Sequence, residues 1–101
     1  MRCVATGYLF RDNKIGDTME DENFAVLLNL TKEKLADRVR ELRLQKHYTQ
    51  EDLEEISGIS RRGIGYIENA EVDIKLSTLL RLSESFQMTL AELLDFPEES
   101  E

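Results

Sequence analysis

Two adjacent arginines, Arg61 and Arg62, are the residues of this sequence whose types suggest the clearest chemistry. They follow a short turn, Gly58-Ile59-Ser60. A guanidinium group is planar and holds five N–H donors in a rigid fork, so it can bind two neighbouring acceptors at once. The O6 and N7 atoms of guanine form such a pair in the DNA major groove. The two arginines therefore predict contact with base edges, while the alternative for each is an ordinary solvated charge.

Two short helices on either side of this turn must position the arginines. Thr49 is a good N-cap, with Asp52 three residues on in a capping-box position, and Ser60 caps the following helix. Gly58 can adopt the left-handed conformation that ends the first helix and turns the chain. This order of helix, tight turn and helix is that of a helix-turn-helix, whose second helix enters the major groove.

Apolar residues at helical spacing define the faces of these two helices that pack inwards. Leu53 and Ile56 share one face of the first helix, and Ile64 and Ile67 share one face of the second. The residues left facing outward on the second helix are Arg61, Arg62, Gly65 and Tyr66.

The rest of the chain after residue 30 is also predicted to be helical. One helix covers residues 32–46 and another residues 75–86, while a third begins after Thr89, with Glu92 completing its capping box. The side chains expected inside the bundle from the first two are Leu35, Ala36, Val39, Leu42, Leu76, Leu79, Leu82 and Phe86, with Leu80 partly covered. The side chains expected either to close the bundle or to reach a second subunit are Leu90, Leu93 and Leu94.

The run from about Leu35 to Leu94 resembles the lambda-repressor-like, or Xre-type, helix-turn-helix transcriptional regulators. The residues that show the resemblance are Arg43 in RELRLQK, Gln50 in TQEDL, Gly58-Ile59-Ser60 at the turn and Glu68-Asn69 after the second helix. The resemblance implies an all-α fold, a compact five-helix lambda-repressor-like DNA-binding bundle with an N-terminal extension. The expected organisation is an extension over residues 1–30, a helix-turn-helix DNA-binding domain over 31–96 and an acidic tail over 97–101.

The resemblance also implies roles for individual residues. Gln50 would contact the DNA backbone, and positions 61, 62 and 66 would face the bases. The full set expected at the DNA is Gln50, Ser60, Arg61, Arg62, Gly65 and Tyr66. Arg43 and Glu68 would form a partly buried structural ion pair. The alternatives are that Gln50 is a plain first-turn residue and that Tyr66 packs over a neighbouring helix.

Several residues depart from the pattern of the family. Glu54 stands where alanine is usual, and Ala70 and Gln87 stand where glycines usually end helices. Gly63 and Gly65 lie inside the predicted recognition helix, where each costs about 1 kcal/mol relative to alanine. Either they loosen this helix, or they let its backbone come close to the wall of a groove.

The net charge of −8 is distributed unevenly along the chain. Residues 32–69 carry eight basic and eight acidic residues, whereas residues 1–31 carry three and five and residues 70–101 carry two and eight. The acidity therefore lies mostly outside the predicted reading helices. Because neutralisation of phosphates supplies most non-specific DNA binding, we expect little binding to arbitrary DNA.

The inventory of reactive residues argues against an enzyme. His47 is the only histidine and Cys3 the only cysteine, so no metal cluster, Cys–His pair or internal disulfide is indicated. We expect no catalytic residue, no metal and no cofactor. No apolar run reaches the roughly 18 residues of a membrane span. A reducing, cytoplasmic setting follows as the default.

The first thirty residues leave several alternatives open. Residues 2–17 are compatible with a short hairpin or a flexible arm, and Met19 is a candidate for the true start. The run FAVLLNL, residues 24–30, is too apolar to remain exposed. It extends the following helix, adds a strand or is buried against a partner. Packing on its own bundle is favoured over a dimer contact through this run or the last helix.

Two functions are consistent with these features. The first is a sequence-specific regulator, a repressor that binds a two-fold DNA operator as a homodimer through the helix at 60–69. The second is a protein-interaction module, such as the antitoxin of a toxin–antitoxin pair, whose DNA binding is autoregulatory or lost.

Overall fold

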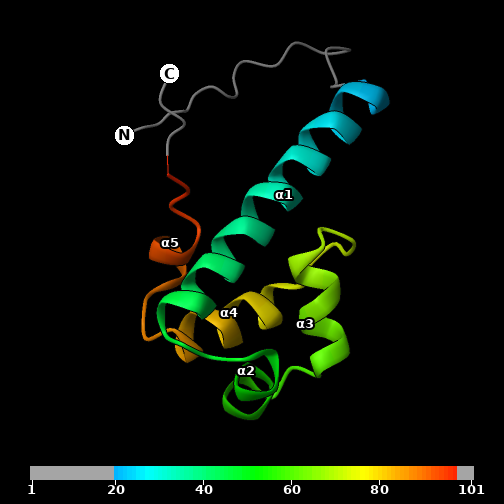
Figure 1. Ribbon diagram of the computed structural model, residues 1–101. Coiled ribbons are helices and arrows are strands. Elements are labelled where there is room, and N and C mark those ends of the chain that lie inside the picture. Colours follow the sequence, from blue (N-terminus) through cyan, green and yellow to red (C-terminus); the bar gives the residue numbers. More distant parts are fainter. Residues whose placement is uncertain (1–19, 98–101) are drawn as a thin grey trace.

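The computed structural model describes residues 20–97 of the chain. Across that range there are five α-helices and no strand (Figure 1): α1 Asp21–Gln45, α2 Gln50–Ser57, α3 Arg61–Glu68, α4 Leu76–Ser85 and α5 Leu90–Leu93. The predicted all-α, five-helix fold is thereby confirmed. The expectations for a hairpin, a flexible arm and a start at Met19 concern residues outside the described range.

Helix α1 begins at Asp21, well before the predicted start at residue 32. Asp21 and Glu22 lie in its first turn, where carboxylates are favourable beside the positive end of the helix dipole. No proline or glycine interrupts residues 21–45, so the apolar run and the predicted helix form one continuous element. The helix crosses the expected domain boundary after residue 30, and its N-terminal half projects beyond the bundle (Figure 1).

The apolar run at residues 24–30 does not pack on its own bundle. Its exposed members are Phe24, Val26, Leu27 and Leu30, each with about half of its surface accessible. Leu28 alone lines a hollow with Leu94 and Phe96. The expectation of local packing is therefore wrong for these four side chains, because α1 extends past the helices that could cover them.

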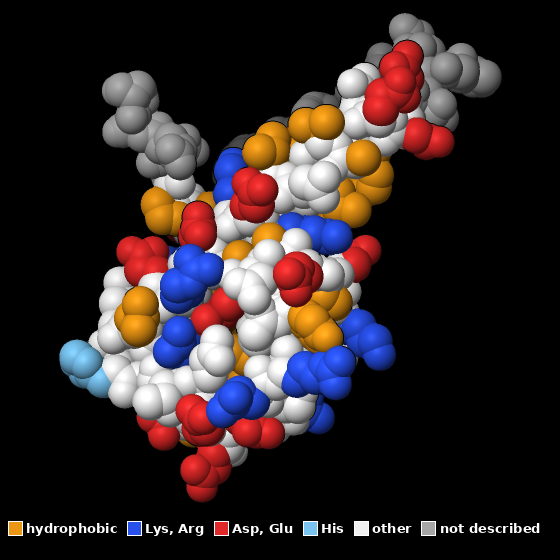
Figure 2. All heavy atoms as spheres, turned by 45° about the vertical axis from the view of Figure 1, so that its right-hand side comes forward, with side chains coloured by type: hydrophobic (Ala, Val, Ile, Leu, Met, Phe, Trp, Pro, Cys, Tyr) orange, Lys and Arg blue, Asp and Glu red, His pale blue; other side chains and the backbone are white. Residues whose placement is uncertain are grey.

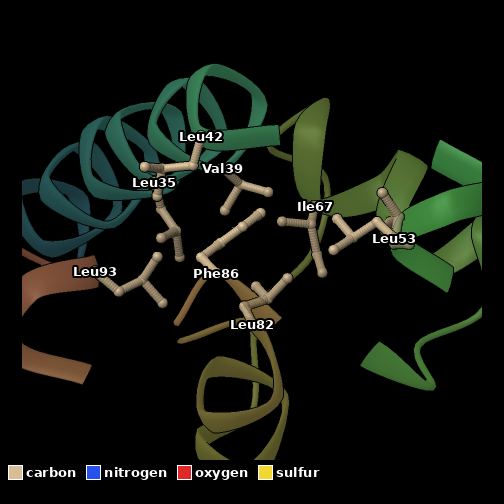
Figure 3. Packing of buried hydrophobic residues seen from close by; sticks show 9 residues of the cluster. Leu35, Val39, Leu42, Leu53, Ile67, Leu82, Phe86 and Leu93 are labelled. Atoms are coloured by element: carbon tan, nitrogen blue, oxygen red, sulfur yellow. The ribbon is translucent and has the colours of Figure 1, made fainter. Parts of the chain in front are cut away.

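The hydrophobic core lies where the C-terminal half of α1 meets the other four helices (Figure 3). Its members are Leu35, Val39, Leu42, Leu53, Ile64, Ile67, Leu82, Phe86 and Leu93. The Phe86 side chain points into the centre of this cluster, toward side chains from α1 and α3 (Figure 3). All of these residues had been expected at the inward faces, apart from Leu93, for which a contact with a second subunit had also been considered.

Two residues expected inside the bundle lie at its surface. Ile56 is 49% exposed, because Ser57 occupies the inward position four residues after Leu53. Leu76 is 62% exposed. As the first residue of α4, Leu76 points back along the helix, away from the packed turns. Helical spacing predicts the direction of a face but not which residues of that face the neighbouring helices cover.

Three helix ends place a residue other than glycine in the left-handed conformation. They are His47, Ala70 and Gln87, with φ of 61°, 59° and 60°. At each, two backbone bonds close the helix: Ala70 N donates to Ile67 O at 3.1 Å and Glu71 N to Tyr66 O at 2.9 Å. This is the Schellman pattern, which usually has glycine at the left-handed position. The loops therefore keep the usual geometry despite the substitutions.

Candidate nucleic-acid interface

A buried ion pair joins α1 to α3. Arg43 Nε donates to Glu68 Oε2 at 2.7 Å and Arg43 Nη2 donates to Glu68 Oε1 at 3.1 Å. The two side chains are only 13% and 4% exposed. Arg43 Nη1 also donates to the carbonyl oxygen of Tyr48 at 2.9 Å, which holds the loop before α2. This pair thus sets the position of α3 relative to α1.

Gln50, the first residue of α2, is attached to the same pair. Its Nε2 donates to Glu68 Oε1 at 3.1 Å, so α1, α2 and α3 meet at one carboxylate. An amide nitrogen carries two hydrogens, and one therefore remains for an external acceptor. Gln50 is half-buried rather than free at the surface. The structure gives this residue a fixed orientation that the sequence did not indicate.

The two helices of the motif are capped as their sequences predict. Thr49 Oγ1 accepts from Asp52 N at 2.9 Å, and Thr49 N donates to Asp52 Oδ2 at 2.8 Å. Gly58 ends α2 with φ of 80°. Ser60 Oγ accepts from Gly63 N at 3.0 Å, so this hydroxyl fixes the start of α3.

Helix α3 separates an inward face from an outward one. Ile64, Ile67 and Glu68 are buried. Arg61, Arg62 and Tyr66 are exposed and Gly65 is half-buried. The structure therefore brings the outward residues expected from the sequence together on one side of α3, with Ser60 at its N-terminal end.

Arg61 is held by a residue that sequence reasoning did not single out. Its Nη1 donates to Oε2 of Glu51, in the first turn of α2, and both side chains are mostly exposed. A backbone hydrogen bond and then the Arg61 guanidinium lower the pKa of Glu51 below the ordinary value of 4.5. The Glu51 carboxylate therefore stays mostly ionised as the pH falls to 4.5, and it loses its negative charge, and with it the pairing with Arg61, only at lower pH. No spacing rule links residues ten apart on two different helices.

Arg62 is held by Tyr66, one turn later on the same helix. Arg62 Nε donates to the Tyr66 hydroxyl at 3.1 Å, and the guanidinium carbon lies 5.7 Å from the centroid of the tyrosine ring. Because Nε is occupied, the two terminal nitrogens remain to bind a pair of acceptors. Tyr66 therefore positions the Arg62 side chain. The sequence had suggested two other roles for Tyr66, a contact with a base or packing over a neighbouring helix.

The two glycines of α3 have different surroundings. A Cβ atom added at Gly63 would lie 3.2 Å from Ser60 Oγ and 3.3 Å from Ile59 Cγ2, so packing of the turn favours glycine there. A Cβ added at Gly65 would meet no atom within 4 Å. Nothing in the described fold requires glycine at 65.

Lys and Arg side chains are spread over the face that includes α3, with carboxylates between them (Figure 2). This matches the balanced charge of residues 32–69. Among residues 20–97, no group of three or more histidine, cysteine or acidic side chains is arranged to hold a metal ion. Over the same part of the chain, no helix is long and apolar enough to cross a membrane.

The buried Arg43–Glu68 pair fixes α3 in the bundle, and α3 presents two arginines on its outward face. This arrangement of α2, turn and α3 is that of a helix-turn-helix DNA-binding domain. The sequence model of a family described as helix-turn-helix (HTH_3) matches residues 39–93. The chain is 41% identical over 63 residues to the control protein C.SmaI of Serratia marcescens. The matched region covers 62% of this chain and 75% of that protein.

Two solved structures are also similar. The restriction–modification controller protein C.AhdI of Aeromonas hydrophila has 32% identity and a TM-score of 0.59, over 61% of this chain and 94% of that one. An HTH_3 family transcriptional regulator of Vibrio cholerae has a TM-score of 0.62 over 65% of this chain and 37% of its own. At 18% identity, the latter supports the fold alone.

The chain belongs to this helix-turn-helix family, and the predicted Xre-type resemblance is confirmed. It is a DNA-binding transcriptional regulator.

Proposed function

We propose that this protein is a sequence-specific repressor that binds a two-fold operator as a homodimer, with α3 of each protomer in a major groove. Arg61 and Arg62 would specify bases, while Gln50 and the main-chain amides at the start of α3 would hold phosphates and set the register. No catalytic step and no cofactor enter this function.

The observation that supports the proposal best is the fixed orientation of the Arg62 guanidinium group. It lies on the exposed face of a helix fixed by a buried ion pair, and Tyr66 holds its Nε while leaving both terminal nitrogens available. Such a fork matches the O6 and N7 acceptors of guanine. A preorganised side chain loses less freedom on binding than a mobile one, so the arrangement favours recognition over simple charge attraction.

Two-fold binding follows from the small size of the reading element. Helix α3 has eight residues, and few of them reach a groove. Two protomers related by a two-fold axis double the contacts and read a palindrome, with half-sites about one helical turn, roughly 34–36 Å, apart.

The relatives suggest which genes are regulated. C.AhdI is described as a restriction–modification controller protein and C.SmaI as a control protein. We therefore propose that the operator of this protein also lies beside restriction–modification genes.

Selection of bound sites from random duplex DNA at near-physiological salt tests the proposal. The expected result is an enriched palindrome with the half-site spacing given above. The alternative, a partner-binding protein such as an antitoxin that has lost DNA binding, predicts no enrichment by folded protein. That result would overturn the proposed function.

A further inference from the structure

The N-terminal half of α1 has a broad apolar face that no described element covers for most of its extent. At about 100° per residue, Phe24, Val26, Leu27 and Leu30 lie within an arc of about 160° on one side of the helix axis, and each is about half exposed. Figure 2 shows hydrophobic side chains along the part of α1 that projects from the bundle. A contiguous exposed apolar patch marks a surface that binds another molecule, so this face calls for a covering surface.

One face of this segment is complementary to itself. At about 100° per residue, the side chains within roughly 60° of Leu27 are Glu20, Asn23, Phe24, Leu30, Thr31 and Lys34. They are arranged symmetrically around Leu27. Glu20 and Lys34 each lie seven residues from it, and Phe24 and Leu30 each lie three residues from it.

We propose that this face pairs with the same face of a second copy of the chain, antiparallel and with the two-fold axis at Leu27. In that arrangement Leu27 meets its own counterpart and Phe24 of each copy meets Leu30 of the other. Glu20 of each copy lies opposite Lys34 of the other, so both ends of the contact carry opposite charges. A parallel arrangement would instead place Glu20 opposite Glu20 and Lys34 opposite Lys34.

The charge pattern is what selects a second copy as the occupant. A self-complementary patch is the requirement of a two-fold interface, in which each residue pair occurs twice. The contact lies at the end of α1 remote from the α2–α3 turn, so it leaves the outward face of α3 free (Figure 1). Because four turns of helix form a small interface, we expect weak association, roughly in the micromolar range.

This contact rests on the homodimer of the proposed function, and it is tested without DNA. Sedimentation of the full chain over a wide range of concentration should show a monomer–dimer equilibrium. Leu27→Lys should weaken association by more than about tenfold while leaving the helical signal unchanged, since this side chain is exposed in the single chain. A wild-type monomer at every concentration, or equal association of a folded Leu27→Lys variant, would overturn the proposal.

Charge exchange tests the antiparallel register. Glu20→Lys alone and Lys34→Glu alone should each weaken self-association roughly tenfold, because each places like charges opposite one another. An equimolar mixture of the two variants should form a heterodimer of wild-type strength. Failure of the mixture to recover would contradict this register.

Cysteine cross-linking locates the axis. In a Cys3→Ser background, Leu27→Cys should form a covalent dimer under mild oxidation. Ala25→Cys, on the opposite side of the same helical turn, should not. Equal cross-linking of both would exclude the contact. A palindrome enriched in the site selection would still support the reading of DNA even if this contact failed, so the two proposals fail separately.

Discussion

At the residue scale, the outward arginines are both occupied within the free protein, but by partners of different kinds. Glu51 pairs with Arg61 from another helix, whereas Tyr66 holds Arg62 on the same helix. An exposed ion pair contributes about 0–1 kcal/mol, so Arg61 can leave Glu51 for a DNA acceptor at little cost. In the proposed complex, Glu51 would then remain as a negative charge close to the DNA.

Replacement of Glu51 by glutamine should therefore raise the affinity for DNA several-fold at low salt and less at high salt. The change removes a competitor for Arg61 and one repulsive charge beside the phosphates. Fluorescence anisotropy with a labelled duplex at two salt concentrations measures the effect. Glu55→Gln, the same change at another exposed position of α2, is the matched control. Equal gains in both variants would mean that release of Arg61 contributes nothing.

Replacement of Gly65 by alanine should have opposite effects on folding and on binding. The helix should gain up to about 1 kcal/mol of stability, since the new methyl group meets no atom of the protein. Binding to the selected operator should weaken if the backbone approaches a groove wall at this position. Urea unfolding and anisotropy on the same sample separate the two effects. Unchanged operator affinity would show that DNA does not come close to residue 65.

At the scale of the elements, local signals predicted the helix starts of the motif well. The capping residues Thr49 and Ser60, and the turn at Gly58, act within a few residues of their own position, and all three have the expected geometry. The exposure of Ile56 could not be predicted in the same way, because it depends on Ser57 taking the inward position beside the neighbouring helices. The pair between Glu51 and Arg61 also depends on the packing angle of two helices, which no local pattern reports.

The extension of α1 through residues 24–30 is one of the three alternatives that the sequence leaves open, but the exposure of this run is not predicted. An apolar run usually packs on its own bundle. A helix whose apolar side chains project into solvent is expected only where another molecule covers them. The sequence shows that the run is apolar, but its location beyond the bundle is a property of the folded chain.

The left-handed helix ends should be improved by glycine. Ala70→Gly and Gln87→Gly should each raise the free energy of unfolding by about 1 kcal/mol, because an L side chain is strained at positive φ. Gly58→Ala should lower it, since φ is 80° and the added Cβ would lie 3.0 Å from Arg81 Nη1. Urea denaturation of the three variants measures these changes. A loss of stability in both glycine variants would contradict the assigned turn geometry.

The ion pair between α1 and α3 should be a large contributor. Glu68→Ala should cost about 3–5 kcal/mol, because it leaves the Arg43 guanidinium, only 13% exposed, without its counter-ion. Asp37→Ala, which removes the carboxylate of an exposed pair with Arg40, should cost about 0–1 kcal/mol. Thermal or urea unfolding of both variants makes the comparison. Similar small losses would show that the buried pair does not stabilise the motif.

For the whole molecule, the distribution of charge sets the balance between specific and non-specific binding. Residues 32–69, which include α2 and α3, have no net charge, and residues 70–101 have a net charge of −6. We therefore expect weak attraction to phosphates, and a greater dependence on base contacts than in a strongly basic protein. In the proposed complex, the two arginines of α3 would therefore contribute to affinity as well as to specificity.

The most direct test compares wild type with two double variants on the selected operator and on a scrambled duplex of the same length. Arg61→Ala/Arg62→Ala removes both forks and both charges, while Arg61→Lys/Arg62→Lys keeps the charges and removes the forks. The account predicts that both variants lose the preference for the operator, by about 1–3 kcal/mol for each guanine contact, and that the lysine variant keeps the binding to scrambled DNA. A lysine variant that still prefers the operator as strongly as wild type would contradict base recognition by α3.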